Sequence, residues 1–395
     1  MKFLRTLSTS RLLLLLLAVA VLAAGVGAIA VAASGGSGPT PPAKPLAGAL
    51  HDSLAAPAPE GITARIKFTN KLFPSGALEG RAGSALMSGA SGRLWATNDG
   101  RGRLELQSDA GDVQVVWNRS VVTVFDASSN TVYRAKLPAQ RSEGKDSGSK
   151  QGIPTVAQIR DLLAKLGARV EISAARPVNV GSRPAYSVRV APKHDGGLLG
   201  AAELAWDAAR PVPLRVGIYA QGASSPVLEL RVSHISYGAI PTSDVAVSPP
   251  AGAKTIDLGS LGTNRDEHHG LGRKNEPQGL QAVQAAAPFL VTAPAKLVGL
   301  PRQDVRLVGG ADSNGALVVY GHGLGAIVVF ERKAAGGAPG AQLGSLPEVS
   351  IDGATGHELA TQLGTILTWK RGGVSYVLAG SLPSAAAEAA ARELK

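Results

Sequence analysis

The chain contains no cysteine. This absence excludes disulfide scaffolds, thiolate zinc sites, iron–sulfur clusters, thiol catalysis and a lipidated N-terminal cysteine. Aromatic residues make up only 4% and charged residues only 17% of the 395 residues, whereas hydrophobic residues reach 45%. That apolar content excludes a wholly disordered chain. The length is too great for one small domain, so we expect two folded domains.

A long apolar segment near the N-terminus predicts the compartment. Leu12 to Ala33 is an uninterrupted apolar run of 22 residues. As a helix it would span about 33 Å, enough for a hydrocarbon core of roughly 30 Å. Basic residues precede it, so residues 1–11 are expected in the cytoplasm and the body of the protein outside.

Two interpretations of the 12–33 segment stay open. It is either an uncleaved transmembrane signal anchor or a signal peptide cut after Ala30-Val31-Ala32, which has the A-x-A form. The protein is accordingly expected to be a single-pass membrane protein with an extracytoplasmic body, or a periplasmic or secreted protein after cleavage. Residues 34–45 are rich in Gly, Ser and Pro and predict a tether.

The charge balance is basic. Forty Lys and Arg against 29 Asp and Glu give a formal net charge of +11. Such an excess is compatible with nucleic acid or with an anionic membrane surface. The expected extracytoplasmic location argues against nucleic acid, so we expect none as a partner.

Short segments of alternating hydrophobicity fill most of residues 61–258. They are separated by turn residues at intervals typical of an antiparallel meander of about eleven strands. We expect helices at 46–55 and 155–166, the second opened by a capping box of Thr155 and Gln158. Residues 259–287 are rich in Gly, Asn and charged residues and predict a linker between two domains. Residues 288–395 predict a small α+β domain that ends in a helix beginning at Pro383.

No catalytic or metal site is predicted. Gly321 to Gly325 resembles a phosphate loop but joins two expected strands, which favours a hairpin. Ser142 and Lys145 have S-x-x-K spacing in a low-complexity loop without partner motifs, and residues 266–269 (Asp-Glu-His-His) lie in the linker. We therefore expect a protein that is not an enzyme and has no cofactor. An exported hydrolase is a third, weakly supported class.

Large side chains on the expected strands are candidates for a binding cavity. In a two-sided sandwich they would simply be core, but in a sheet that curls around a cavity they would form the wall for an apolar ligand. The helix at 155–166 would then cover the mouth as a lid through Ile159, Leu162 and Leu163. The candidate wall residues are Trp95, Leu104, Trp117, Phe125, Tyr133, Trp206 and Tyr219.

Three stretches, in order, resemble the LolA/RseB superfamily of periplasmic lipoprotein-binding proteins. They are Gly181 to Pro192, Glu203 to Gly222 and His234 to Leu258. The resemblance covers residues 46–258. It implies an α+β fold, an unclosed antiparallel β-barrel with covering helices, that binds acyl chains of lipids or lipoproteins.

The C-terminal stretch Thr368 to Leu394 is similar to the strand–turn–strand–helix ending of the small domain in RseB/MucB-type regulators. That resemblance implies an anti-sigma factor, or another membrane protein, as partner. Two functions therefore stay open: a LolA-like carrier at the membrane, and an RseB-like regulator of envelope-stress signalling.

Overall fold

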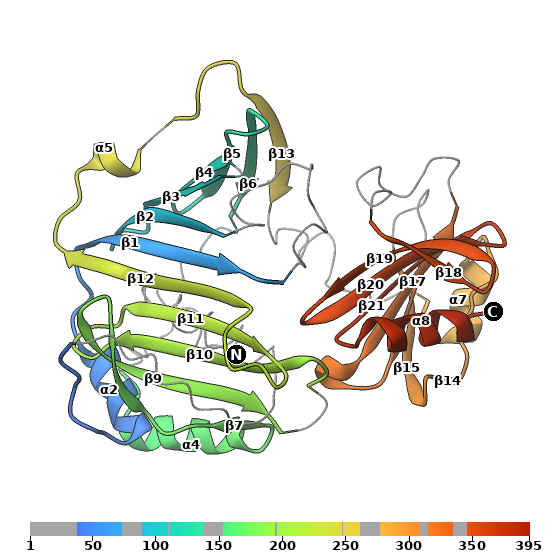
Figure 1. Cartoon of the computed structure of the whole chain (residues 1–395), viewed down its shortest axis with the longest axis horizontal. Helices are drawn as coiled ribbons and strands as arrows, with labels where there is room; N and C mark the ends of the chain where they lie inside the picture. The colour runs from blue at the N-terminus through green and yellow to red at the C-terminus, as the bar shows by residue number, and fades with distance from the viewer. Residues whose placement is uncertain are drawn as a thin grey trace, which may run out of the picture. The chain divides into compact units, whose positions relative to one another are not determined.

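The computed structural model describes residues 38–72, 89–109, 111–137, 153–193, 196–246, 248–260, 277–308, 315–334 and 346–395. These residues form two compact units (Figure 1). The first holds the described residues up to 260, except Leu72 and residues 196–199, which group with the second. The expected membrane span at 12–33, Ser142, Lys145 and residues 266–269 lie outside the described residues. Within the described ranges, no helix has the length and hydropathy needed to cross a membrane.

The described part of the first unit contains one mixed sheet of thirteen strands. In space the order is β13-β6-β5-β4-β3-β2-β1-β12-β11-β10-β9-β7, with β8 paired to β9. The two ends of this order do not pair, so the barrel is unclosed, as expected. The strands are β1 (Gly61–Asn70), β2 (Ala90–Thr97), β3 (Gly102–Ser108), β4 (Gly111–Trp117), β5 (Val121–Asp126), β6 (Thr131–Lys136), β7 (Val170–Ile172), β8 (Arg176–Val180), β9 (Arg183–Pro192), β10 (Leu199–Asp207), β11 (Pro213–Ala220), β12 (Leu228–Tyr237) and β13 (Lys254–Ser260).

Two features of this sheet differ from the expected meander. β13 runs parallel to β6, because the chain returns across the sheet after the short helix α5 (Thr242–Val245) instead of turning in a hairpin. The alternating stretch from Asn179 to Pro192 does not form a single strand, because it contains the turn of a hairpin between β8 and β9. Its turn residues, Gly181 and Ser182, have φ of 58° and 62°, which only glycine adopts at little cost.

The two expected helices are present in the first unit. α2 (Leu46–Ala55) and α4 (Val156–Gly167) pack against each other. The capping box is confirmed: Gln158 N donates to Thr155 Oγ1 at 3.3 Å, and Thr155 N donates to Gln158 Oε1 at 2.8 Å. These bonds pair two amides that the first helical turn leaves without partners.

The segment before α2 is bound to the sheet over part of the expected tether. Asn179 Nδ2 of β8 donates to the Pro39 carbonyl at 2.9 Å, and Tyr186 Oη of β9 donates to the Pro42 carbonyl at 2.7 Å. Pro41 is buried. The chain is thus packed from about residue 38, because its carbonyls meet donors that are distant in sequence.

The described part of the second unit holds an eight-stranded sheet in the order β14-β15-β16-β17-β21-β20-β19-β18. α7 (Leu280–Ala286) and α8 (Ser384–Glu393) pack on it, and Val283 and Ala387 are fully buried in its core. The strands are β14 (Lys296–Leu297), β15 (Leu300–Val308), β16 (Gly315–Tyr320), β17 (Ile327–Lys333), β18 (Glu348–Ile351), β19 (Ala354–Thr361), β20 (Gly364–Arg371) and β21 (Val374–Gly380).

Two local expectations are resolved in the second unit. Gly321 to Gly325 connects the antiparallel strands β16 and β17 through a single 3₁₀ turn, η2 (Gly323–Gly325), so the hairpin interpretation is confirmed. By contrast, α7 lies in the stretch expected as linker. The first part of that stretch is rich in Gly, Asn and charged residues, but α7 itself is mostly apolar, and its Val283 is buried in the core.

A carboxyl group is buried in the core of the second unit. Glu331 on β17 is 0% exposed. Its Oε2 accepts a hydrogen bond from Thr292 N at 2.8 Å, while Oε1 has no partner among the described residues. Burial raises the pKa of Glu331 from 4.5 to about 7, against the opposing effect of the Thr292 bond.

This burial predicts a pH-dependent stability of the second unit. Between the unfolded pKa of 4.5 and the folded pKa of about 7, the folded state binds more protons than the unfolded state. The free energy of unfolding should therefore fall as pH rises through this window, by up to about 3 kcal/mol. Hydrogen exchange of the β17 amides, corrected for the intrinsic effect of pH on exchange, measures this free energy. In Glu331→Gln its dependence on pH between 4.5 and about 7 should vanish. An unchanged dependence would mean that another group causes it.

Candidate functional site

One line of apolar side chains crosses eight strands of the first unit. The strand register pairs Ile235 with Ala64 and Ala64 with Leu94. Each further strand adds one apolar residue opposite the previous one. We call this line the apolar row: Ile235, Ala64, Leu94, Leu104, Val115, Val124, Tyr133 and Ile256. Neighbouring strands lie about 4.8 Å apart, so the row is roughly 34 Å long.

The burial of the apolar row changes along its length. At one end, Ile235 and Ala64 are 3% and 1% exposed. From Leu94 on β2 to Ile256 on β13, every side chain of the row is only half-buried. The row is thus fully buried at β12 and β1. Over the next four strands its side chains pack against the same core and stay partly exposed; they are Leu94, Leu104, Val115 and Val124.

The opposite face of the same strands is polar. The line beside the apolar row there contains Val116 between polar and aromatic side chains: Trp95, Arg103, Val116, Thr123 and Arg134. The Arg103 guanidinium lies 5.1 Å from the centre of the Trp95 ring and also pairs with Glu105. This half of the sheet is therefore amphipathic, with one face suited to apolar ligands and the other to solvent.

The seven predicted wall residues do not form one wall. Leu104 and Tyr133 belong to the apolar row, and Trp117 lies in the adjacent line on the same face, paired with Gly102. Trp95 and Phe125 lie on the polar face, because their positions differ by one residue from those of the row.

The remaining two wall residues lie away from the apolar row. Trp206 is 0% exposed and packs against Tyr186, with a ring separation of 6.0 Å, in a cluster that includes Ala49 of α2. Tyr219 is in a polar network: its hydroxyl bonds to Glu203 at 2.9 Å, and Arg215 bonds to it at 2.7 Å. Burial is the largest cause of the raised pKa of Tyr219.

Helix α4 does not lie over the apolar row. It contacts α2 and β7, which is at the far end of the strand order from β6. Ile159 is buried and Leu163 half-buried, but Leu162 is 50% exposed. The three predicted lid residues thus belong to a helix at the β7 end of the sheet.

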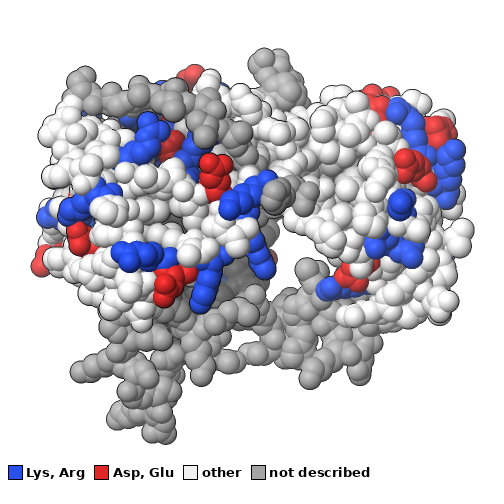
Figure 2. Space-filling model, turned by 90° about the horizontal axis from the view of Figure 1, so that it is seen from below, with Lys and Arg blue, Asp and Glu red and all other residues white. Residues whose placement is uncertain are grey.

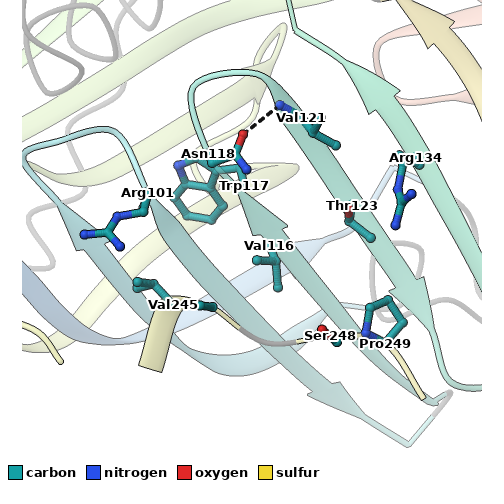
Figure 3. A pocket seen from close by; sticks show the side chains of 11 residues that line it. Arg101, Val116, Trp117, Asn118, Val121, Thr123, Arg134, Val245, Ser248 and Pro249 are labelled. Atoms are coloured by element: carbon teal, nitrogen blue, oxygen red, sulfur yellow. Dashed lines mark hydrogen bonds between the residues drawn. The ribbon is translucent and has the colours of Figure 1, made fainter. Parts of the chain in front are cut away.

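A pocket lies on the polar face, between β4, β5 and the segment that follows α5 (Figure 3). Its volume is about 440 Å³, within the usual range for ligand pockets. Val116 and Thr123 line it, with Arg101 and Arg134 at its edge. Asn118 Oδ1 accepts from Val121 N at 2.9 Å and closes the adjoining turn. This pocket and the apolar row therefore lie on opposite faces of the same strands.

Sequence reasoning missed Leu94, Val115 and Val124, the central members of the apolar row. The period-2 alternation in β3 does indicate which residues share a face. In β4, however, Val115, Val116 and Trp117 are consecutive apolar residues, and in β5 Val124 is followed by Phe125. The pattern alone therefore leaves the face undecided in both strands. Among the described residues, no group of three potential metal-ligating side chains is present.

No protein-family model and no curated protein matches the chain. The fold is similar to that of MucB and of the LolA superfamily. MucB in complex with periplasmic MucA is 12% identical with a TM-score of 0.41, over 85% of this chain and 93% of that one. MucB alone is 14% identical with a TM-score of 0.37, over 88% and 96%. A LolA superfamily protein from Nitrosomonas europaea is 10% identical with a TM-score of 0.22, over 52% and 99%. At these identities the likeness concerns the fold alone.

The different burial of Trp206 and Trp95 predicts that their removal lowers the stability of the first unit by different amounts. Trp206→Ala should destabilise the first unit by about 3–5 kcal/mol, because it leaves a cavity beneath α2. Trp95→Ala, on the half-exposed polar face, should cost much less. Urea denaturation followed by circular dichroism measures both. Equal losses would contradict the assignment of Trp206 to the core and Trp95 to the surface.

Proposed function

We propose that the first unit binds acyl chains of lipids or lipoproteins along the apolar row, without covalent chemistry. The observation that carries this proposal is the row itself. Six consecutive strands present half-buried apolar side chains in one line, on an unclosed sheet. An extended acyl chain is the ligand whose length and chemistry suit such a line.

The binding energy in this proposal comes from apolar burial. Each CH₂ removed from water contributes about 0.8 kcal/mol. The row offers no charged group, and its single hydroxyl is that of Tyr133, so it suits the chain of a lipid rather than its head group. Of the predicted wall residues, the proposal retains Leu104, Trp117 and Tyr133 and assigns no binding role to the other four.

The proposal places this unit outside the cytoplasm and next to a membrane. Its support is the apolar run from Leu12 to Ala33, preceded by Lys2, Arg5 and Arg11. Because the carbonyls of Pro39 and Pro42 are hydrogen-bonded to β8 and β9, a span at 12–33 would hold the sheet close to the bilayer that supplies its ligand. Cleavage after Ala32 would instead release the protein.

A second candidate function is regulation, with an anti-sigma factor or another membrane protein as partner. The observation that favours it is the second unit, which has its own sheet and core. The apolar row is complete within the first unit, so acyl-chain binding alone gives the second unit no task. In this regulatory function the second unit binds the partner, and its binding depends on whether the apolar row holds a ligand.

Acyl-chain binding is tested by a pair of neighbouring substitutions. Val115→Asp places a carboxylate in the middle of the apolar row and should weaken binding of a fluorescent fatty acid at least about tenfold, which is 1.4 kcal/mol. Val116→Asp, one residue on, changes the opposite face and the pocket there, and should leave the affinity nearly unchanged.

The same pair separates the two faces. If Val116→Asp abolishes binding and Val115→Asp does not, the ligand occupies the pocket of the polar face and the apolar row is not the site. Circular dichroism of both variants controls for folding. If the wild-type protein carries no lipid on native mass spectrometry and takes none up, acyl-chain binding is ruled out.

The regulatory function makes a separate prediction. Affinity capture of the full chain from membranes should retain a single-pass membrane protein. Substitutions on the second unit should reduce its recovery, while Val115→Asp should not abolish it. A partner that is retained equally after removal of the second unit would contradict this assignment.

A further inference from the structure

The start of the described chain has a fixed position on the first unit. The carbonyls of Pro39 and Pro42 accept hydrogen bonds from Asn179 and Tyr186. A side chain at Gly38 would approach Asn179 Nδ2 to within 2.6 Å, so the backbone passes close to β8. The point from which the N-terminal segment leaves the unit is therefore set by packing on β8 and β9.

The length of chain before this point limits the distance from a membrane anchor. The apolar run ends at Ala33, and only four residues separate it from Gly38. Fully extended, this connection reaches at most about 18 Å. A folded unit of about two hundred residues has a diameter of roughly 45 Å. If residues 12–33 are held in the bilayer, the side of the unit around Gly38 must face it.

Helix α4 lies on this side. α2 directly follows the segment that is bound to β8 and β9, residues 38–45, and packs on α4. His51 Nδ1 of α2 lies 3.0 Å from the carbonyl oxygen of Pro154, just before α4. Figure 1 shows the bound segment, α2 and α4 together at one end of the sheet, beside β7 and β9.

The exposed side of α4 combines apolar and basic side chains. Among the described residues, five large apolar side chains are exposed, and two of them, Ile153 and Leu162, belong to α4 or to the residues just before it. Lys165 lies three residues after Leu162 on α4, and Arg169 lies just beyond the end of the helix at Gly167. All three side chains are exposed.

The charges around this side are mainly positive. Among the described residues, neither Lys165 nor Arg169 forms an ion pair. Lys193 Nζ donates to the Gly167 carbonyl at the end of the helix. The acidic Asp161 lies four residues before Lys165, on the same side of the helix as this lysine. Figure 2, which views this end of the unit, shows several basic side chains with fewer acidic ones between them.

We propose that α4 is an interfacial helix that rests on an anionic lipid bilayer, with Leu162 inserted among the lipids and Lys165 and Arg169 on their head groups. Exposed apolar and basic side chains on one helix are the pattern of such helices. The inference rests on the membrane tether of the proposed function and adds which face of the body meets the membrane. It does not depend on what the apolar row binds.

The absence of cysteine allows a direct test with single labels. The full chain is reconstituted into phosphatidylcholine–phosphatidylglycerol vesicles with a fluorescent label on Leu162→Cys or, as control, on Ser129→Cys. Ser129 is exposed in the β5–β6 turn, at the other end of the strand order. Brominated lipids should quench the label at position 162 and leave the label at 129 unquenched. Lys165→Glu with Arg169→Glu should abolish the quenching, as should vesicles without phosphatidylglycerol.

Flotation of the vesicles after an alkaline wash separates the two ways in which the inference can fail. A chain that does not float with the vesicles has no membrane anchor, which overturns the tether and this inference together. A chain that floats while its label at 162 stays unquenched keeps the tether and overturns the inference alone. Equal quenching at 162 and 129 also overturns it, because the body would then have no fixed orientation.

Discussion

The alternation of side chains along each strand, combined with a register that holds across eight strands, is the constraint on which the first unit depends. A shift of one residue in any of these strands would exchange Val115 for Val116, or Val124 for Thr123, on the face of the apolar row. The apolar row exists only because every pairing from β12 to β13 keeps the same phase. Its buried end at Ala64 and Ile235 anchors the register, since any shift there would bury polar neighbours.

Different physical means hold the two ends of the sheet. Toward β7 and β9, one face is covered by α2 and α4, and Trp206 fills the space beneath α2. The same region contains half-buried charges, where Arg215 bonds to Glu203 at 2.9 Å and to Glu229 at 2.5 Å. Toward β6 and β13, half-buried apolar side chains continue without a described helix over them. A rigid, covered half and an apolar, partly exposed half suit a unit that keeps its shape while a ligand enters.

The second unit is built on another principle. Its sheet is backed by α7 and α8, its core contains Trp369 stacked on Tyr376 at 4.9 Å, and it buries the carboxyl of Glu331. A single hydrogen bond from Thr292 compensates that carboxyl only in part. The raised pKa of Glu331 is the expected result, because removal from water penalises the charged form.

Features that depend on neighbours in sequence were predictable. The sequence alone determined α2, the capped start of α4, the final helix, most strand segments and the hairpin at residues 321–325, since caps, turns and alternation act within a few residues. It also indicated the unclosed barrel through the family resemblance. It did not determine that α7 belongs to the second core, nor that β13 returns parallel to β6. Both depend on contacts that are distant in sequence.

The candidate site shows the same division. Of the predicted wall residues, Leu104, Trp117 and Tyr133 share one face, whereas Trp95 and Phe125 lie on the other face. All five were chosen because they are large side chains on expected strands. Composition and alternation tell which residues can share a face. Only the tertiary structure decided which face is apolar, which aromatic side chains α2 buries, and where the N-terminal segment leaves the sheet, because register, sheet curvature and long-range hydrogen bonds join residues that the sequence pattern treats separately.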